Sequence, residues 1–326
     1  MTSRERFRQT MGYGRPDRVP YFEEGIRDEV FDVWRRQGMP PDTDLSHMFP
    51  FDHCEEIDLD LEPRPPFRNW PTSRSELGVW RRRLDPNNPG RLPSDWNERV
   101  RAWQGRDHVL MARVHNGFFL TMGVGDWARF ATVIYLLKDD PQFVREAMAM
   151  RGEFAAELAE RVLREVEVDA VIFSEPVGGN DRPLLSPRMY EEFVLASYEP
   201  LLEVIRRHKV ETIILRTYAN ARVLLPSVLR WGFNCLWACE VNAQAMDYRD
   251  VRREFGRDLR LVRGIDLDAL RHGKEAIRRE IADKVPPLLV EGGYVPLADG
   301  RVREDVPFEN YVYYRQLLQA VTSRPT

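Results

Sequence analysis

Residues that can exchange protons or bind acidic groups stand at the ends of apolar runs in this chain. Glu175 and His115 each close such a run, and Arg216 and Tyr218 follow another. Carboxyl, imidazole and phenol groups can give or take a proton, and a guanidinium can hold a carboxylate through two parallel hydrogen bonds. The pattern therefore indicates acid–base chemistry on an acidic molecule, with Glu175, His115 and Tyr218 as candidate catalytic residues.

Each of these residues also has a structural interpretation. Glu175 could bind a metal or pair with an arginine, and His115 could be a core histidine that holds a loop. Arg216 could form an ion pair with Glu175 or Glu240 instead of binding a substrate. Tyr218 could simply pack against its neighbours. The residue types alone leave these alternatives open.

Other polar residues occupy comparable positions along the chain. Candidate contacts for an acidic substrate are Arg216, Glu240, Arg27, Arg263, Arg301 and Asn116. Cys239 is a weak candidate for a metal ligand or a nucleophile. We expect no metal site, and the one unorthodox set that could replace it is His115, Glu175 and Cys239. Further strand-end candidates are Glu23, Glu24, Asp266 and Asp299.

Eight short apolar runs would position these residues. The expected strands are 18–23, 56–61, 108–115, 169–175, 211–218, 235–241, 259–265 and 294–298. Near-continuous apolar strands separated by helices are typical of a parallel sheet buried on both faces. Eight such units predict a closed (β/α)8 TIM barrel, in which functional residues lie at the C-terminal ends of the strands.

The helices between these runs have recognisable ends. Apolar residues at helical spacing predict a helix over 141–166, and Ser186-Pro187 is typical of a helix start. A third amphipathic helix is expected over 267–285, ending before Pro286-Pro287.

One stretch interrupts the alternation. Residues 62–106 are rich in proline and hold four tryptophans. We interpret this stretch as an insertion after the second strand, within one domain over 1–326. It either lies near the barrel mouth or is a surface excursion held by its aromatic residues.

Composition narrows the class of protein. A formal charge of −4 with scattered arginines argues against nucleic-acid binding. No apolar run approaches the roughly 18–20 residues that span a bilayer, and the charged N-terminus lacks the apolar region of a signal peptide. Three cysteines are too few for a disulfide framework. We therefore expect a cytoplasmic protein with no membrane partner.

Four segments resemble proteins of the uroporphyrinogen decarboxylase superfamily. They follow one another in order along the chain: 2–24 with its PDRVP turn, 174–208 with PLLSP, 220–266, and 292–314. The resemblance implies a (β/α)8 barrel, and it implies a homodimer because relatives often pair. The superfamily includes cofactor-free decarboxylases of tetrapyrrole acetates and zinc-dependent methyltransferases that act with corrinoid proteins or cobalamin.

The chain departs from the patterns of both groups. Where many relatives carry His-Ser-Cys/Asp-Gly-Asn after the fifth strand, this chain has Arg216-Thr217-Tyr218-Ala219-Asn220, and no cysteine follows Cys239. Arginine is not a normal zinc ligand, so the usual zinc site is absent. The arginine-rich motif that receives substrate carboxylates near the N-terminus is missing, and Asp299-Gly300-Arg301 replaces an expected histidine.

Three functions remain. The first is a metal-independent lyase, a decarboxylase of a small acidic or polycarboxylate substrate (tetrapyrrole-like on the family pattern), which needs positioning and a proton donor but no cofactor. The second is a corrinoid- or cobalamin-linked methyltransferase or demethylase with a rebuilt or lost zinc site. The third is a non-catalytic binding protein on the same barrel. The substituted zinc ligands and the many ionisable strand-end residues favour the first.

Overall fold

The computed structural model describes residues 1–177, 179, 181–218, 220–239 and 246–323. The chain divides into two compact units. The central unit comprises residues 55–106 and 110–234, and the terminal unit comprises 1–54, 107–109 and 235–326. The 62–106 segment belongs to the central unit, and the single domain over 1–326 stays a prediction.

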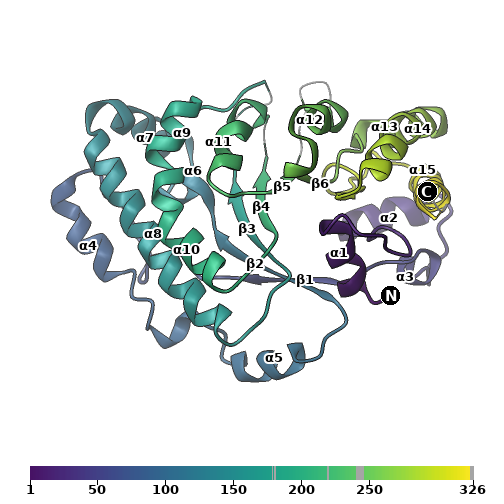
Figure 1. The fold of residues 1–326 in the computed structure, drawn as a ribbon. Helices are drawn as coiled ribbons and strands as arrows, with labels where there is room; N and C mark the ends of the chain where they lie inside the picture. Colours follow the sequence, from purple (N-terminus) through teal and green to yellow (C-terminus); the bar gives the residue numbers. More distant parts are fainter. Residues whose placement is uncertain (178, 180, 219, 240–245, 324–326) are drawn as a thin grey trace. The chain divides into compact units, whose positions relative to one another are not determined.

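Strands β1 to β4 form the sheet of the central unit in chain order. They span Cys54–Asp58, Val109–His115, Ala170–Glu175 and Ile213–Thr217. β2, β3 and β4 are parallel, and the register aligns Ser174 with Arg216 and Glu175 with Thr217. Helices α8 and α10 run along one face of these strands, with α6 and α9 beside them (Figure 1).

The helices of the central unit follow the strands as α/β alternation requires. They are α4 (Leu77–Arg82), α5 (Trp96–Trp103), α6 (Gly117–Thr121), α7 (Trp127–Asp139), α8 (Pro141–Leu163), α9 (Pro187–Phe193), α10 (Glu199–Arg207) and α11 (Leu225–Arg230), with short 3-10 helices η1 (Arg74–Glu76), η2 (Pro89–Arg91), η3 (Leu195–Tyr198) and η4 (Arg222–Leu224).

Two of the predicted helix starts are confirmed. α8 begins at Pro141, where the Asp140 side chain accepts a hydrogen bond from the Phe143 N–H. α9 begins at Pro187, where the Ser186 hydroxyl accepts from the Met189 N–H. In both, proline takes the first position and a polar side chain caps the free N–H groups.

The 62–106 insertion packs against the helix layer of the central unit. Trp80 is fully buried and its ring meets Phe143 of α8 at 6.4 Å. The Trp96 indole donates to Glu165 just beyond α8. Aromatic residues of the segment therefore hold it against α8 and the residues that follow, and its place near the barrel mouth stays a prediction.

The terminal unit contains strands β5 (Cys235–Ala238), β6 (Arg260–Val262) and β7 (Tyr294–Val295), which pair in parallel and in chain order. Its helices are α1 (Ser3–Met11), α2 (Asp28–Arg36), α3 (Leu45–Met48), α12 (Tyr248–Phe255), α13 (Leu267–His272), α14 (Lys274–Glu291) and α15 (Phe308–Thr322), with the 3-10 helix η5 (Gly256–Asp258). An isolated parallel bridge joins Ile26 to Val302.

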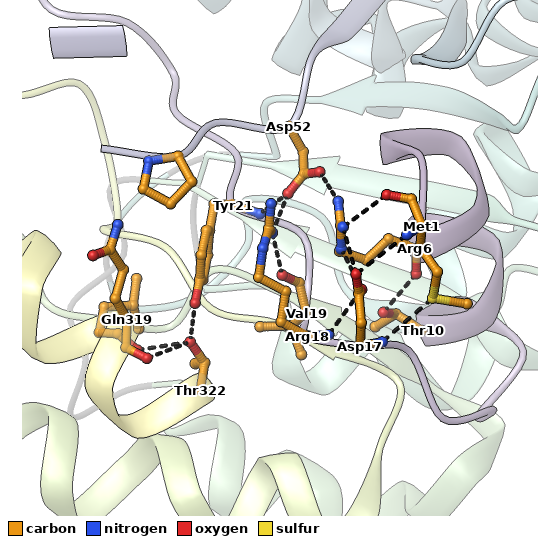
Figure 2. A network of polar contacts seen from close by, with 12 residues as sticks. Met1, Arg6, Thr10, Asp17, Arg18, Val19, Tyr21, Asp52, Gln319 and Thr322 are labelled. Carbon is orange, nitrogen blue, oxygen red and sulfur yellow. Dashed lines mark hydrogen bonds and ion pairs between the residues drawn. The ribbon is translucent and has the colours of Figure 1, made fainter. Parts of the chain in front are cut away.

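The predicted strand over 18–23 is wrong, so the described residues form seven strands instead of eight. Figure 2 shows the Asp52 carboxylate beside this segment, where it accepts hydrogen bonds from Arg18 and Tyr21. The Asp52 carboxylate accepts from the Tyr21 N–H at 2.7 Å and from Arg18 at 2.5 Å. A backbone N–H that donates to a side chain is not free to donate to a neighbouring strand of a sheet.

The predicted helix over 267–285 is also wrong in its bounds. Gly273, at a φ of 104°, separates α13 from α14, and α14 then continues through Pro286 and Pro287 to Glu291. A proline inside a helix leaves the carbonyl four residues earlier without its usual donor. Arg249 donates to one such carbonyl, that of Asp283, which helps α14 to tolerate the prolines.

The observed class is thus α/β with parallel strands in chain order, a TIM-barrel-like pattern. The eighth strand of the expected barrel is missing from the described residues, and closure of the barrel stays a prediction. Within the described ranges, no helix combines the length and apolarity needed to cross a bilayer.

Candidate functional site

Four charged side chains from β1, β2 and β4 meet on one face of the central sheet. Arg216 donates to both carboxylate oxygens of Glu56, at 3.2 and 2.5 Å. Arg113 lies 3.6 Å from Glu56 and donates to Asp58 at 2.7 Å. The Arg113 side chain is 32% exposed and that of Asp58 is 58% exposed. We call Arg216, Glu56, Arg113 and Asp58 the arginine–carboxylate cluster.

The strand period places this cluster on the face opposite the helices. Parallel partners in register share a face, so Arg216 lies on the same face as Ser174, and Arg113 on that of Ile172. Ile172 and Ser174 are two residues apart and point the same way. This face therefore presents two guanidinium groups, one of which already holds a carboxylate through paired hydrogen bonds.

Glu175 and His115 lie on the other face, under the helices. Glu175 is adjacent to Ser174 and therefore points away from Arg216. A register shift between Arg113 and His115 aligns His115 with Phe173, on the same side as Glu175. The expectation that these two residues share one cavity with Arg216 is not met, because the sheet separates them.

The Glu175 carboxylate is fully buried and has three donors. The Phe118 N–H donates to Oε1 at 2.9 Å, and the Tyr198 and Tyr190 hydroxyls donate to Oε2 at 2.7 and 3.2 Å. Burial nevertheless raises the pKa of Glu175 to about 7, because desolvation of the charged form outweighs these hydrogen bonds. Gly117 permits this packing, because a Cβ there would lie 2.6 Å from Glu175 Oε1.

His115 joins the same buried cluster. Its ring lies 4.5 Å from that of Tyr198, and its Nδ1 accepts from the Gly117 N–H at 3.0 Å. Burial, with a smaller contribution from Arg151, lowers the pKa of His115 to about 3. The imidazole is therefore neutral near pH 7, with its proton on Nε2.

Tyr218 and Asn116 follow β4 and β2 respectively. Tyr218 lies two residues beyond Arg216, just after the strand ends, and is 44% exposed. Asn116 stands at the start of α6 without a capping side-chain hydrogen bond. Of the three candidate proton donors, only Tyr218 is exposed to solvent.

A second group of charges gathers in the terminal unit, around Arg263. Arg263 follows β6, is fully buried, and forms ion pairs with Glu24 and with Asp299, the latter at 3.2 Å. The pKa of Glu23 is raised by burial, and its carboxylate accepts from Tyr311 at 3.0 Å and from Arg315 at 3.2 Å. Glu24, Arg263 and Asp299, predicted as strand-end residues, are thus joined by ion pairs, but no strand precedes Glu23 and Glu24 because the predicted strand over 18–23 does not form.

The backbone at Arg263 is strained. Its φ is 87°, a left-handed conformation that non-glycine residues rarely adopt, and Gly264 follows at 96°. Burial lowers the pKa of Arg263 to about 10, although Asp299 opposes the shift. Strain together with a buried charge is found at functional sites more often than elsewhere.

The remaining predicted residues do not join these clusters as described. Arg27 forms an exposed ion pair with Glu29 at 3.5 Å, and Arg301 is exposed. Cys239 is buried in the terminal unit. Glu240 lies outside the described residues. Among the described residues, no group of three or more His, Cys, Asp and Glu side chains is placed to hold a metal, so the set of His115, Glu175 and Cys239 finds no support.

Several residues of these clusters were not singled out from the sequence. Glu56 and Asp58 alternate with apolar Ile57 and Leu59, a period-2 signal that could have revealed them. Tyr311 and Arg315 are four apart on the last helix and therefore share a face. Tyr190 and Tyr198 carry no comparable signal, since tyrosines in helices are usually core residues.

Comparisons with known proteins give one weak structural likeness. No protein-family model and no curated protein matches the chain. Among solved structures, the chain is similar to a GH26 β-mannanase from Bacteroides ovatus, with 11% identity, a TM-score of 0.41, and coverage of 96% of this chain and 92% of that one. Membership of the uroporphyrinogen decarboxylase superfamily is not supported by these comparisons, and so weak a likeness to a mannanase carries no argument about activity.

Proposed function

We propose that the chain is a metal-independent carboxy-lyase that decarboxylates a small acidic molecule. The observation that carries this proposal is the two-point contact between Arg216 and Glu56, on the face of the central sheet opposite α8 and α10. Glu56 accepts two hydrogen bonds from the Arg216 guanidinium, as a substrate carboxylate would. The guanidinium is therefore already oriented to bind a carboxylate through two hydrogen bonds.

In the proposed reaction, a substrate carboxylate replaces Glu56 on Arg216, and Arg113 holds a second acidic group. The bond between the substrate carbon and a further carboxylate then breaks, CO2 leaves, and the electron pair stays on the carbon. The Tyr218 hydroxyl gives that carbon a proton and recovers one from solvent. The substrate must delocalise the electron pair itself, through a neighbouring carbonyl or an electron-accepting ring such as that of a tetrapyrrole precursor.

Tyr218 is preferred to Glu175 and His115 as the proton donor for a physical reason. A donor must come within hydrogen-bond reach of the substrate. Glu175 and His115 are 0% and 2% exposed, on the opposite face of the sheet, whereas Tyr218 is 44% exposed. We assign the buried pair a supporting role, which is to hold α6, α9 and η3 against β3.

The alternative functions have weaker support. A corrinoid-linked methyltransferase would need a thiol-activating metal site, and no such residue group has been identified among the described residues. A non-catalytic binding protein would need the same arginines but no proton donor. If the Tyr218→Phe variant loses turnover but still binds the substrate, Tyr218 takes part in catalysis and the protein is more than a binding protein.

The test is release of CO2 from a panel of small polycarboxylates by the purified chain without added cofactor. We expect Tyr218→Phe to lower kcat by about 10²-fold or more with little change in KM, as removal of a proton donor should. The matched control is Tyr135→Phe, because Tyr135 is 67% exposed on α7. Binding of polycarboxylates with no CO2 release would overturn the lyase proposal in favour of a binding protein.

A further inference from the structure

A groove in the terminal unit shares no lining residue with the clusters described above. Its volume is about 740 Å³, and it is lined by the loop after α1, by residues 289–294 at the end of α14, and by the end of α15. That volume falls within the roughly 300–1,000 Å³ typical of small-molecule sites. The proposed lyase chemistry uses none of its residues.

Arginines surround Tyr13 on one wall of the groove. The guanidinium carbons of Arg257, Arg260 and Arg252 lie 5.3, 5.5 and 5.7 Å from the centre of the Tyr13 ring. Arg252 donates to the Tyr13 hydroxyl and to backbone carbonyls, and Arg260 donates to the Met11 carbonyl. In the described part of the chain, none of these three guanidiniums has a carboxylate within ion-pair distance.

Two more arginines line the groove itself. Arg15 is exposed and has no hydrogen bond or ion pair among the described residues. Arg18 is fixed by Asp52 at 2.5 Å and by the Val19 carbonyl at 2.9 Å, as Figure 2 shows. Asp52 also pairs with Arg6, which has a second carboxylate partner in Asp17.

The acidic residues of the groove do not cancel this charge. Asp17 is already engaged by Arg6 and by the N-terminal ammonium group. Glu291 is the other carboxylate in the lining, and it stands at the exposed end of α14. The lining thus holds three guanidiniums, those of Arg15, Arg18 and Arg257, against two carboxylates, of which Asp17 is already paired with cations outside the lining. This excess of positive charge favours binding of an anion.

We propose that this groove binds a small phosphorylated anion. Arg15, Arg18 and Arg257 line it together, and three guanidiniums provide more donors than one carboxylate can accept. A phosphate group has three acceptor oxygens and up to two negative charges, which matches such a set. The groove is larger than inorganic phosphate requires, so the ligand carries an organic part or a second phosphate.

Calorimetry of the full chain with inorganic pyrophosphate as the probe tests this proposal. Arg257→Gln and Arg15→Gln should each weaken binding about tenfold, because each removes charge-assisted hydrogen bonds. Arg253→Gln is the matched control: its side chain is 75% exposed on α12 and already pairs with Asp250. The control should change the affinity less than about twofold.

The outcomes separate cleanly, because Arg15, Arg257 and Arg253 are all exposed and their substitution leaves the core intact. Tighter binding of a sugar bisphosphate than of pyrophosphate would assign the site to an organic phosphate. Equal binding would assign it to the diphosphate group alone. No pyrophosphate binding by the wild type, or equal weakening by the control, would overturn the proposal.

Discussion

Arg216 is the residue on which the proposed chemistry depends. Its side chain is 11% exposed, and its two hydrogen bonds to Glu56 fix the plane of the guanidinium before any substrate arrives. Such pre-organisation reduces the entropy lost on binding, but Glu56 must be displaced. In the substrate-free protein, Glu56 therefore orients the Arg216 guanidinium and also competes with the substrate carboxylate for it.

Glu175 gives a prediction about pH and stability. Its pKa is about 7 in the folded protein and near its ordinary 4.5 in the unfolded chain, so folding favours the protonated carboxyl. The resulting stabilisation is present below pH 4.5 and is lost as pH rises through 7, by roughly 3 kcal/mol in all. Glu175→Gln should remove this dependence in urea unfolding measured at pH 5, 6 and 8.

His115 acts in the opposite direction, which is why the variant must be compared with the wild type at each pH. Its folded pKa of about 3 lies below its ordinary 6.5, so its contribution to stability is lost as pH falls below 6.5. The difference between the two proteins isolates Glu175, because His115 is present in both. Parallel curves for wild type and Glu175→Gln would show that the carboxyl is already ionised at pH 5.

At the residue scale, the sequence predicted where candidate residues lie along the strands better than it predicted the face of the sheet to which their side chains point. The apolar runs correctly located His115 and Glu175 at the ends of β2 and β3, and Arg216 next to the end of β4. Their faces depend on strand register, and the irregularity between Arg113 and His115 that turns His115 toward the helices has no signature in residue types. The Arg263 cluster draws Tyr311 and Arg315 from a distant helix, which strand-end reasoning does not reach.

At the scale of elements, one buried arginine holds the 62–106 insertion together. The Arg91 side chain is fully buried and donates to four backbone carbonyls, those of Asp60, Glu62, Arg83 and Asp85. It also pairs with the Asp60 carboxylate at 3.3 Å. These bonds supply donors to backbone carbonyls of the loops between the short helices of this segment.

Arg91→Met should therefore lower the free energy of unfolding by about 2–4 kcal/mol, because several buried carbonyls lose their donor. Arg99→Met is the matched control, since Arg99 is half exposed and forms a surface pair with Asp95. The control should cost less than about 1 kcal/mol. Equal effects in urea unfolding would mean that Arg91 does not organise the segment.

Helix ends were predictable where neighbouring residues in the sequence cap the helix. They were not predictable where a side chain from another helix supplies the hydrogen bond. Ser186 and Pro187 fix the start of α9 by local chemistry. The end of α14 was misplaced because Arg249, from another helix, donates to the Asp283 carbonyl that a proline leaves unpaired. Such rescue depends on tertiary contacts, which the local pattern does not contain.

At the scale of the whole molecule, alternation of apolar runs and helices predicted the α/β class and seven of the strands. The remaining expected strand, over 18–23, failed because Asp52 attracts both Arg18 and the Tyr21 N–H. That carboxylate lies about thirty positions away, beyond any local pattern. The activity is left to direct tests.

The account also predicts how the whole protein responds to removal of metals. The proposed steps use arginines and a tyrosine, so CO2 release should be unchanged, within about twofold, after dialysis against EDTA. Metal analysis of the same sample provides the control. Loss of activity on dialysis with recovery on adding zinc would move the assignment to the methyltransferase class.

The most direct test of the central claim is the affinity for malonate, a simple dicarboxylate probe, measured by calorimetry in three proteins. If Arg216 receives a substrate carboxylate in place of Glu56, Glu56→Gln should bind malonate more tightly than the wild type, because the competing carboxylate is gone. Arg216→Ala should bind it at least about tenfold more weakly, with little loss of stability. Affinities that are the same in all three proteins would contradict the account.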